Sequence, residues 1–145
     1  PWGTPDAVLA PALQNFTQLA PLVESTEDRD SLDALRDWTM REHARIAAAI
    51  AARRAAGRVR ECHGDLHLGN LVMLDGRATP FDCIEFNASL RWIDVMSELA
   101  FLVMDLVDHG ERAAAHRVLD GYLSATGDYD GLAVLPFHLV YRAMV

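Results

Sequence analysis

Apolar residues recur at helical spacing in two long blocks of this 145-residue chain, and a segment with a different pattern separates them. The first block holds a run over residues 12–23 and a longer run over residues 29–56. The second block predicts three helices, over residues 94–109, 111–125 and 132–145. Because a helix with one apolar face must bury that face against another element, the pattern predicts a mainly α fold.

Cap and turn residues indicate where the first two helices begin and end. Residues 1–11 are rich in Pro, Gly and Thr, so we expect turns there, and Pro21 should distort the end of the first helix. The acidic residues 25–30 are typical of a helix start, and Gly57 is a suitable C-cap for the long helix. The expected buried stripe of that helix consists of Leu32, Leu35, Trp38, Ile46 and Ile50.

The segment between the two blocks predicts strands and turns. Residues 59–62 form a short extended stretch, and residues 71–74 and 77–81 predict a β-hairpin around the Asp75-Gly76 turn. Pro80 should lie at the end or edge of the second strand, because it cannot donate a ladder hydrogen bond.

These elements predict a single domain over residues 1–145, mainly α with one small β-hairpin. Residues 1–58 would form its first helical part, residues 59–92 would carry a loop and the hairpin, and residues 93–145 would form the C-terminal helices. The hairpin is expected to return the chain beside the loop that precedes it, residues 63–70.

Three oxygen-bearing side chains of the middle segment occur in an order that suits phosphoryl transfer. That reaction requires one carboxylate to orient the attacking hydroxyl, and an amide oxygen and a second carboxylate to hold Mg²⁺ against nucleotide phosphates. Asp65, Asn70 and Asp82 supply these groups in that order. Gly64 and Gly69 allow a turn that would point the first two side chains into one cleft.

The eight residues from His63 to Asn70 read His-Gly-Asp-Leu-His-Leu-Gly-Asn and resemble the catalytic loop of aminoglycoside phosphotransferases and choline-kinase-like enzymes. Phe81-Asp82 is similar to the metal-binding segment of that family, and residues 94–101 are similar to the helix that follows it. In that helix Glu98 stands where the family often has Asp. Residues 62–70, 80–87 and 90–94 together are most similar to a bacterial branch whose members are often fused to a C-terminal P-loop ATP-binding domain.

The resemblance implies the C-terminal lobe of a protein-kinase-like fold and an ATP-dependent, Mg²⁺-dependent phosphotransferase. Such an enzyme would transfer the γ-phosphoryl group to an alcohol group of a small molecule. Asp65 would be the catalytic base or position the hydroxyl, and Asn70 and Asp82 would bind the metal and, through it, the nucleotide. His63 would brace the loop, and His67 would contact the substrate cleft or pack beneath it.

The nucleotide-gripping parts of that family are absent from the sequence. All 13 basic residues are Arg, none is Lys, and the nine glycines form no phosphate-binding glycine-rich loop. In the resembling family these parts belong to an N-terminal lobe. The chain also begins at Pro1 rather than at Met, so we expect a fragment that is inactive alone and completed by an N-lobe of the same polypeptide.

Charge and hydropathy exclude several other classes of protein. The formal net charge of −8 does not suit a nucleic-acid-binding surface. The longest apolar stretch, residues 99–107, is interrupted by Asp105 and is shorter than the roughly 20 residues that a membrane span needs. With two cysteines and no signal peptide, the sequence favours a reduced, cytoplasmic setting.

Two alternative functions are consistent with parts of the sequence. His63, Asp65 and His67 form an H-x-D-x-H pattern that could bind a transition metal in a metal-dependent hydrolase, although this leaves Asn70 and Asp82 unexplained. The chain could also be a non-catalytic, kinase-like binding or regulatory module that serves an attached ATP-binding domain.

Overall fold

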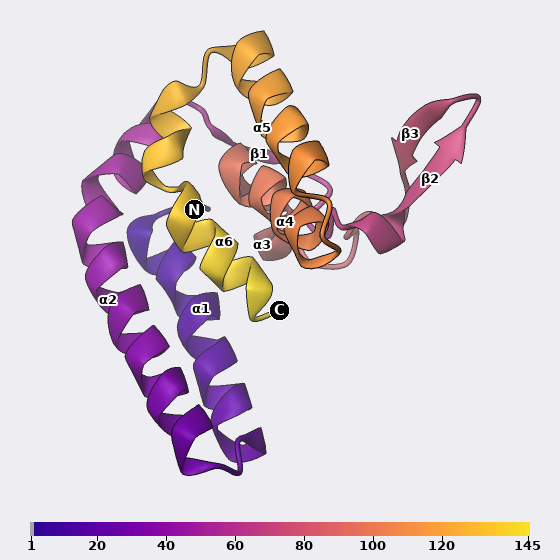
Figure 1. Cartoon of the computed structure of the whole chain (residues 1–145). Coiled ribbons are helices and arrows are strands. Elements are labelled where there is room, and N and C mark those ends of the chain that lie inside the picture. Colours follow the sequence, from indigo (N-terminus) through magenta and orange to yellow (C-terminus); the bar gives the residue numbers. More distant parts are fainter. Residues whose placement is uncertain (1) are drawn as a thin grey trace.

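Helix α4 (Val95–Asp108) lies at the centre of the molecule and contributes more buried residues than any other element. In the computed structural model, which describes residues 2–145, α4 packs against α5 (Arg112–Thr126) and α6 (Leu135–Ala143) (Figure 1). Pro1 lies outside the described residues. The buried residues of α4 are Met96, Ser97, Leu99, Ala100, Phe101, Val103 and Leu106.

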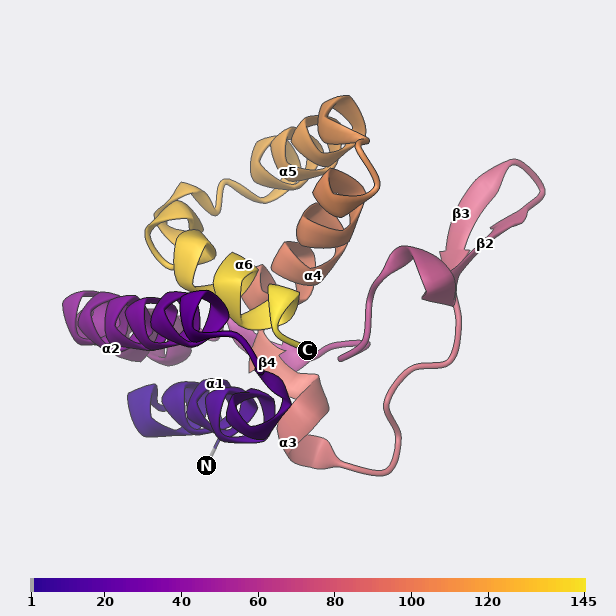
Figure 2. The same cartoon turned by 60° about the horizontal axis from the view of Figure 1, so that its bottom comes forward.

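The first two helices, α1 (Pro5–Leu19) and α2 (Thr26–Ala55), lie side by side and are joined through a 3₁₀ turn at Ala20–Leu22 (Figures 1 and 2). The expectation of turns throughout residues 1–11 was wrong, because α1 already begins at Pro5. Thr4 caps this start, since its Oγ1 accepts a hydrogen bond of 3.2 Å from the amide of Ala7. Proline suits the first position of a helix, where no N–H is needed.

The long helix α2 follows its prediction closely. Ser25 is the N-cap, and its Oγ accepts a hydrogen bond of 3.0 Å from the amide of Asp28. At the other end Gly57 has a φ of 72°, and the amides of Gly57 and Arg58 donate to the carbonyls of Arg54 and Arg53. This is a Schellman ending, as the glycine indicated.

The stripe of α2 is buried only over its second half. Ile46 and Ile50 are fully buried, whereas the expected core residues Leu32, Leu35 and Trp38 are half-buried. This half of the helix packs on α6, which accounts for the deeper burial there.

The predicted hairpin is confirmed as β2 (Leu71–Leu74) and β3 (Arg77–Pro80), with Leu71 opposite Pro80 and Leu74 opposite Arg77. Asp75 and Gly76 have φ angles of 50° and 75°, as a two-residue hairpin turn requires. The hairpin projects away from the helices in both views (Figures 1 and 2).

The structure contains a second two-stranded sheet that the sequence pattern did not predict. It pairs β1 (Val59–Glu61) with β4 (Trp92–Asp94) in antiparallel register, and the short helix α3 (Ala88–Arg91) leads into β4. A strand of three residues is too short to show alternation, so β4 carries no periodic signal.

The third C-terminal helix is shorter than expected. Residues 129–133 form a 3₁₀ turn, Tyr129–Ala133, and α6 begins only at Leu135. The fold is therefore mainly helical with two small antiparallel sheets. Within residues 2–145 no helix has the length and apolar character needed to cross a bilayer.

One buried ionic network joins three distant parts of the chain. The guanidinium of Arg53 on α2 binds both carboxylate oxygens of Asp94, at 2.7 and 2.8 Å, and both of Asp128, at 2.7 and 2.8 Å. The hydroxyl of Tyr122 also donates to Asp128, at 2.7 Å. Hydrogen bonding from Arg53 lowers the pKa of Asp128, and although burial opposes the charge of Arg53, the two carboxylates raise the pKa of the guanidinium.

We predict that Arg53→Met lowers the free energy of unfolding by about 3–5 kcal/mol, because it leaves Asp94 buried without a counterion and Asp128 with only the more distant Arg58, at 3.6 Å. Chemical denaturation at neutral pH measures this loss. Since the pKa of Asp128 is lowered in the folded state, the stabilisation is present above about pH 4 and is lost as the pH falls, so wild type and variant should converge in acid.

Arg45→Met on the same helix is the matched control, because Arg45, whose side chain is 60% exposed, forms an ion pair with Glu42. It should leave the denaturation midpoint nearly unchanged. Equal losses in the two variants would contradict a structural role of the network.

Candidate active site

Glu98, in the first turn of α4, binds the backbone at the start of the loop over residues 63–70. Its carboxylate accepts hydrogen bonds from the amides of His63, at 2.8 Å, and Gly64, at 3.1 Å. Gly64 has a φ of 88°, and a Cβ there would lie 2.9 Å from the carbonyl oxygen of Leu90. Only glycine fits this close approach, so the residue type and the two amide contacts together set the path of the loop.

A second carboxylate of α4 holds the other end of the loop. Oδ2 of Asp105 accepts a hydrogen bond of 2.7 Å from the amide of Leu68. Asp105 follows Glu98 by seven residues, about two helical turns, so both side chains lie on one face of α4. The sequence carries a signal for this pair, because only apolar residues separate Glu98 from Asp105 in the predicted helix over residues 94–109.

Arg142 on α6 holds the same loop from another side. Its Nη1 donates to the carbonyl of Gly64, at 3.2 Å, and its Nε donates to the carbonyl of Ser97, at 3.3 Å. The guanidinium lies over the ring of Phe101, 4.7 Å from its centroid. Burial lowers the pKa of Arg142. No sequence pattern connects an arginine near the end of the chain with this loop.

The structure brings Asp65 and Asn70 into direct contact. Nδ2 of Asn70 donates to Oδ2 of Asp65, at 3.0 Å, and to the carbonyl of Asp65, at 2.9 Å. The side chain of Asp65 is 38% exposed, whereas Asn70 is 8% exposed. The buried amide thus orients a carboxylate that solvent or a substrate can reach.

The two histidines of the loop use their ring nitrogens inside the site. His63 contacts the carbonyl of Phe81 through Nε2, at 2.7 Å, and its Nδ1 accepts a hydrogen bond of 3.3 Å from the amide of Asp65. His67 accepts a hydrogen bond from Gly69 through Nδ1, at 3.1 Å, and its Nε2 lies 3.4 Å from Oδ2 of Asp65. His63 therefore connects the loop to the segment after the hairpin, and His67 lies beside Asp65.

Asp82 lies next to the loop through its neighbours in the chain. The amide of Phe81 donates to the carbonyl of Asn70, at 3.0 Å, and the amide of Ile84 donates to the carbonyl of His63, at 2.9 Å. Asp82 itself is exposed, has a φ of 58°, and makes no side-chain hydrogen bond to Asp65 or Asn70. Such a left-handed conformation is uncommon for a residue other than glycine and is frequent at functional sites.

The transition-metal alternative finds little support in this geometry. Both ring nitrogens of His63 are occupied by backbone groups. Across residues 2–145 no three His, Cys, Asp or Glu side chains are grouped so that they could hold a metal ion. The H-x-D-x-H pattern is therefore better explained by the loop's own hydrogen bonds.

Cys62, immediately before the loop, is not a reactive thiol. Burial, followed by the nearby carboxylates of Glu98 and Asp94, raises its pKa to about 12. The thiolate that a nucleophile requires is therefore scarce at neutral pH.

Comparisons with known proteins give a family match and several relatives. A family model described as the phosphotransferase enzyme family matches residues 5–135. The uncharacterized proteins Rv2004c of Mycobacterium tuberculosis and Mb2027c of Mycobacterium bovis are each 36% identical to the chain over 95 residues, which are 62% of this chain. The chain matches only 19% of the length of these relatives. No solved structure gives a significant match.

We predict that Glu98→Ala and Asp105→Ala free different ends of the loop. Glu98→Ala should accelerate hydrogen exchange of the His63 and Gly64 amides by about tenfold to a hundredfold, since a hydrogen bond to a charged group contributes about 1.5–3 kcal/mol. Asp105→Ala should accelerate exchange of the Leu68 amide instead.

Residue-resolved hydrogen exchange by NMR measures both effects, and each variant is the control for the other. If both variants accelerate all three amides equally, or neither changes any of them, the two carboxylates do not hold the loop as described.

Proposed function

The chain belongs to the phosphotransferase enzyme family, and we propose that it is the C-terminal lobe of a kinase that transfers the γ-phosphoryl group of ATP to a hydroxyl of a small molecule. The observation that carries the proposal is the contact between Asp65 and Asn70 on a loop held at both ends by α4. A positioned carboxylate beside a buried amide is the arrangement that this chemistry uses.

Asp65 would orient the acceptor hydroxyl and take its proton. Asn70 binds one carboxylate oxygen, Oδ2, and the described residues provide no hydrogen bond to the other, Oδ1. That oxygen can accept a hydrogen bond from an alcohol, and the side chain is exposed enough for an alcohol to reach it. The amide of Asn70 limits rotation of the carboxylate, which favours one productive orientation.

Asn70 and Asp82 would hold Mg²⁺, which would neutralise charge on the nucleotide phosphates when bound. The donor chemistry fits this ion, because Mg²⁺ prefers hard oxygen ligands. Nδ2 of Asn70 is engaged by Asp65, and the described residues donate no hydrogen bond to its Oδ1 or to the carboxylate of Asp82. His63 would keep the two ligand segments together through its contact with Phe81.

The nucleotide-gripping lysine and glycine-rich loop would come from another part of a longer polypeptide. The chain has no Lys, and it corresponds to only 19% of the length of its relatives. The exposed apolar side chains of the projecting hairpin, Val72, Met73 and Leu74, support an N-lobe that covers this element. An attached P-loop domain and a bacterial, cytoplasmic setting stay predictions of the sequence.

We predict that Asp65→Asn, made in the longer polypeptide, lowers turnover by about a hundredfold to ten-thousandfold, the usual contribution of a general base. The amide keeps the size of the side chain and one oxygen that can accept from Nδ2 of Asn70, but it cannot take the proton. Turnover is measured with Mg²⁺-ATP and a panel of small alcohols, and circular dichroism checks the fold.

Asp75→Asn in the hairpin turn is the control and should retain full turnover, because asparagine tolerates the positive φ of that position. Wild-type turnover by Asp65→Asn would refute the base assignment. A wild-type protein that binds nucleotide but transfers no phosphoryl group to any acceptor would favour the non-catalytic module.

We further predict that Asp82→Ala removes most of the Mg²⁺ dependence of nucleotide binding. Titration calorimetry with ATP, with and without Mg²⁺, measures this effect in the same polypeptide. Asp75→Ala carries the same change at another exposed residue of positive φ and should bind Mg²⁺-ATP like the wild type. Unchanged Mg²⁺-ATP affinity in Asp82→Ala would contradict the metal assignment.

A further inference from the structure

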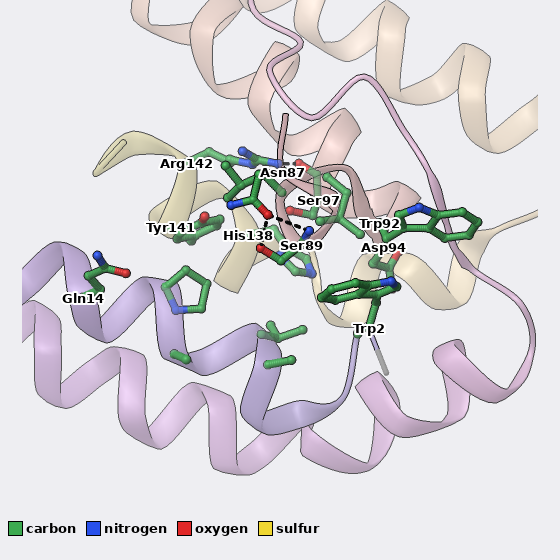
Figure 3. Close-up of a pocket in the computed structure, with 17 residues that line it drawn as sticks. Trp2, Gln14, Asn87, Ser89, Trp92, Asp94, Ser97, His138, Tyr141 and Arg142 are labelled. Carbon is green, nitrogen blue, oxygen red and sulfur yellow. Dashed lines mark hydrogen bonds between the residues drawn. The ribbon is translucent and has the colours of Figure 1, made fainter. Parts of the chain in front are cut away.

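A cavity of about 380 Å³ lies apart from the three proposed phosphoryl-transfer residues, none of which lines it. It is enclosed by the first half of α1, by residues 87–94 and by the last turns of α6 (Figure 3). Its volume is within the range of small-molecule sites. Trp2, Trp92, Leu90 and Pro11 make much of its wall apolar.

The polar groups of the cavity include a histidine nitrogen without a partner. His138 is 3% exposed, and its buried Nδ1 forms no hydrogen bond to any described residue. Burial lowers its pKa to about 4, so the ring is neutral at physiological pH and can present an N–H or a lone pair at this nitrogen. A buried nitrogen that the protein leaves unsatisfied gains a hydrogen bond if a ligand in the cavity reaches it.

Arg142, which also lines the cavity, is a buried cation without a neighbouring carboxylate. It is 6% exposed and donates only to the carbonyls of Gly64 and Ser97. Among residues 2–145 no carboxylate lies within 4 Å of it, and its Nη2 makes no hydrogen bond. The equally buried Arg53, by contrast, is neutralised by two carboxylates. Buried charges are normally paired, so Arg142 is suited to an anion.

The carboxylate already in the cavity wall does not cancel this charge. Asp94 gives both of its oxygens to Arg53 and accepts a further hydrogen bond from the amide of Met96, at 2.8 Å. Glu98 and Asp65 act on Arg142 only at longer range. The cationic group that remains for a ligand is therefore Arg142.

Figure 3 shows how these groups are arranged. The indole rings of Trp2 and Trp92 lie toward one end of the cavity, Arg142 and Tyr141 lie toward the other, and His138 lies between them. An aromatic wall favours a planar ring, which it can stack against or meet edge to face. The arrangement thus offers a place for a ring and, beside it, a place for a negative charge.

We propose that this cavity binds a small aromatic carboxylic acid, with its ring against Trp92 and Trp2 and its carboxylate at Arg142 and His138. The proposal concerns a site other than that of phosphoryl transfer and holds whether or not the protein is a kinase. Because Arg142 also binds the carbonyl of Gly64, a ligand here would contact the support of the loop over residues 63–70.

Titration calorimetry with indole-3-acetate and indole-3-acetamide tests the proposal. The acid should bind saturably with one site per chain, and the amide should bind at least about tenfold more weakly, because it loses the charge-assisted hydrogen bonds. Trp92→Ala should lower the affinity for indole-3-acetate by at least about tenfold, because the ring loses its contact with the indole of Trp92. Trp38→Ala is the matched control, because Trp38 lies on α2 away from the cavity, and it should bind normally.

A second variant, Ala7→Trp, tests the same cavity if Trp92→Ala fails to fold. Ala7 lines the cavity but is exposed on α1, so a larger side chain there should fill the cavity without disturbing the core, and binding should be lost. The proposal is overturned if the acid does not bind at millimolar concentration, if acid and amide bind equally, or if a folded Ala7→Trp variant binds like the wild type.

Discussion

The ion pair between Arg53 and Asp94 fixes the carboxylate that caps the central helix, and the candidate site depends on that helix. Asp94 pairs with Val59 across the β1–β4 sheet, accepts from Arg53, and caps α4 through the amide of Met96. Once α4 begins there, its two carboxylates at positions 98 and 105 lie under the loop and hold its amides. A shift of one residue in α4 would rotate both by about 100° and separate them from the loop.

The two buried arginines illustrate how one side chain serves different purposes. Arg53 has its full complement of carboxylate partners and connects α2, α4 and the segment before α6. Arg142 donates hydrogen bonds to two backbone carbonyls, and no carboxylate of the described residues forms an ion pair with it. The charge of Arg53 is thus balanced within the protein, whereas the charge of Arg142, at the wall of a cavity, is not.

The helical blocks and the hairpin could be predicted because their signals are local. Apolar spacing, the Asp75-Gly76 turn and Gly57 act within a few residues, and all three features are present as expected. The start of α1 was missed because the Thr4-Pro5 cap was outweighed by the turn-like composition around it. The network of Arg53 could not be foreseen, since its partners lie 41 and 75 residues away. In the site, the loop motif indicated Asp65 and Asn70, but the contacts that hold the loop depend on tertiary packing.

We propose above all that Asn70 and Asp82 hold the metal ion of a phosphotransferase. A crystal structure of the longer polypeptide with Mn²⁺ and a non-hydrolysable ATP analogue tests it most directly, because anomalous scattering locates the metal. We expect a metal peak bound by Oδ1 of Asn70 and the carboxylate of Asp82, with the terminal phosphate facing Asp65. A metal–nucleotide complex bound elsewhere, with these two side chains free, would contradict it.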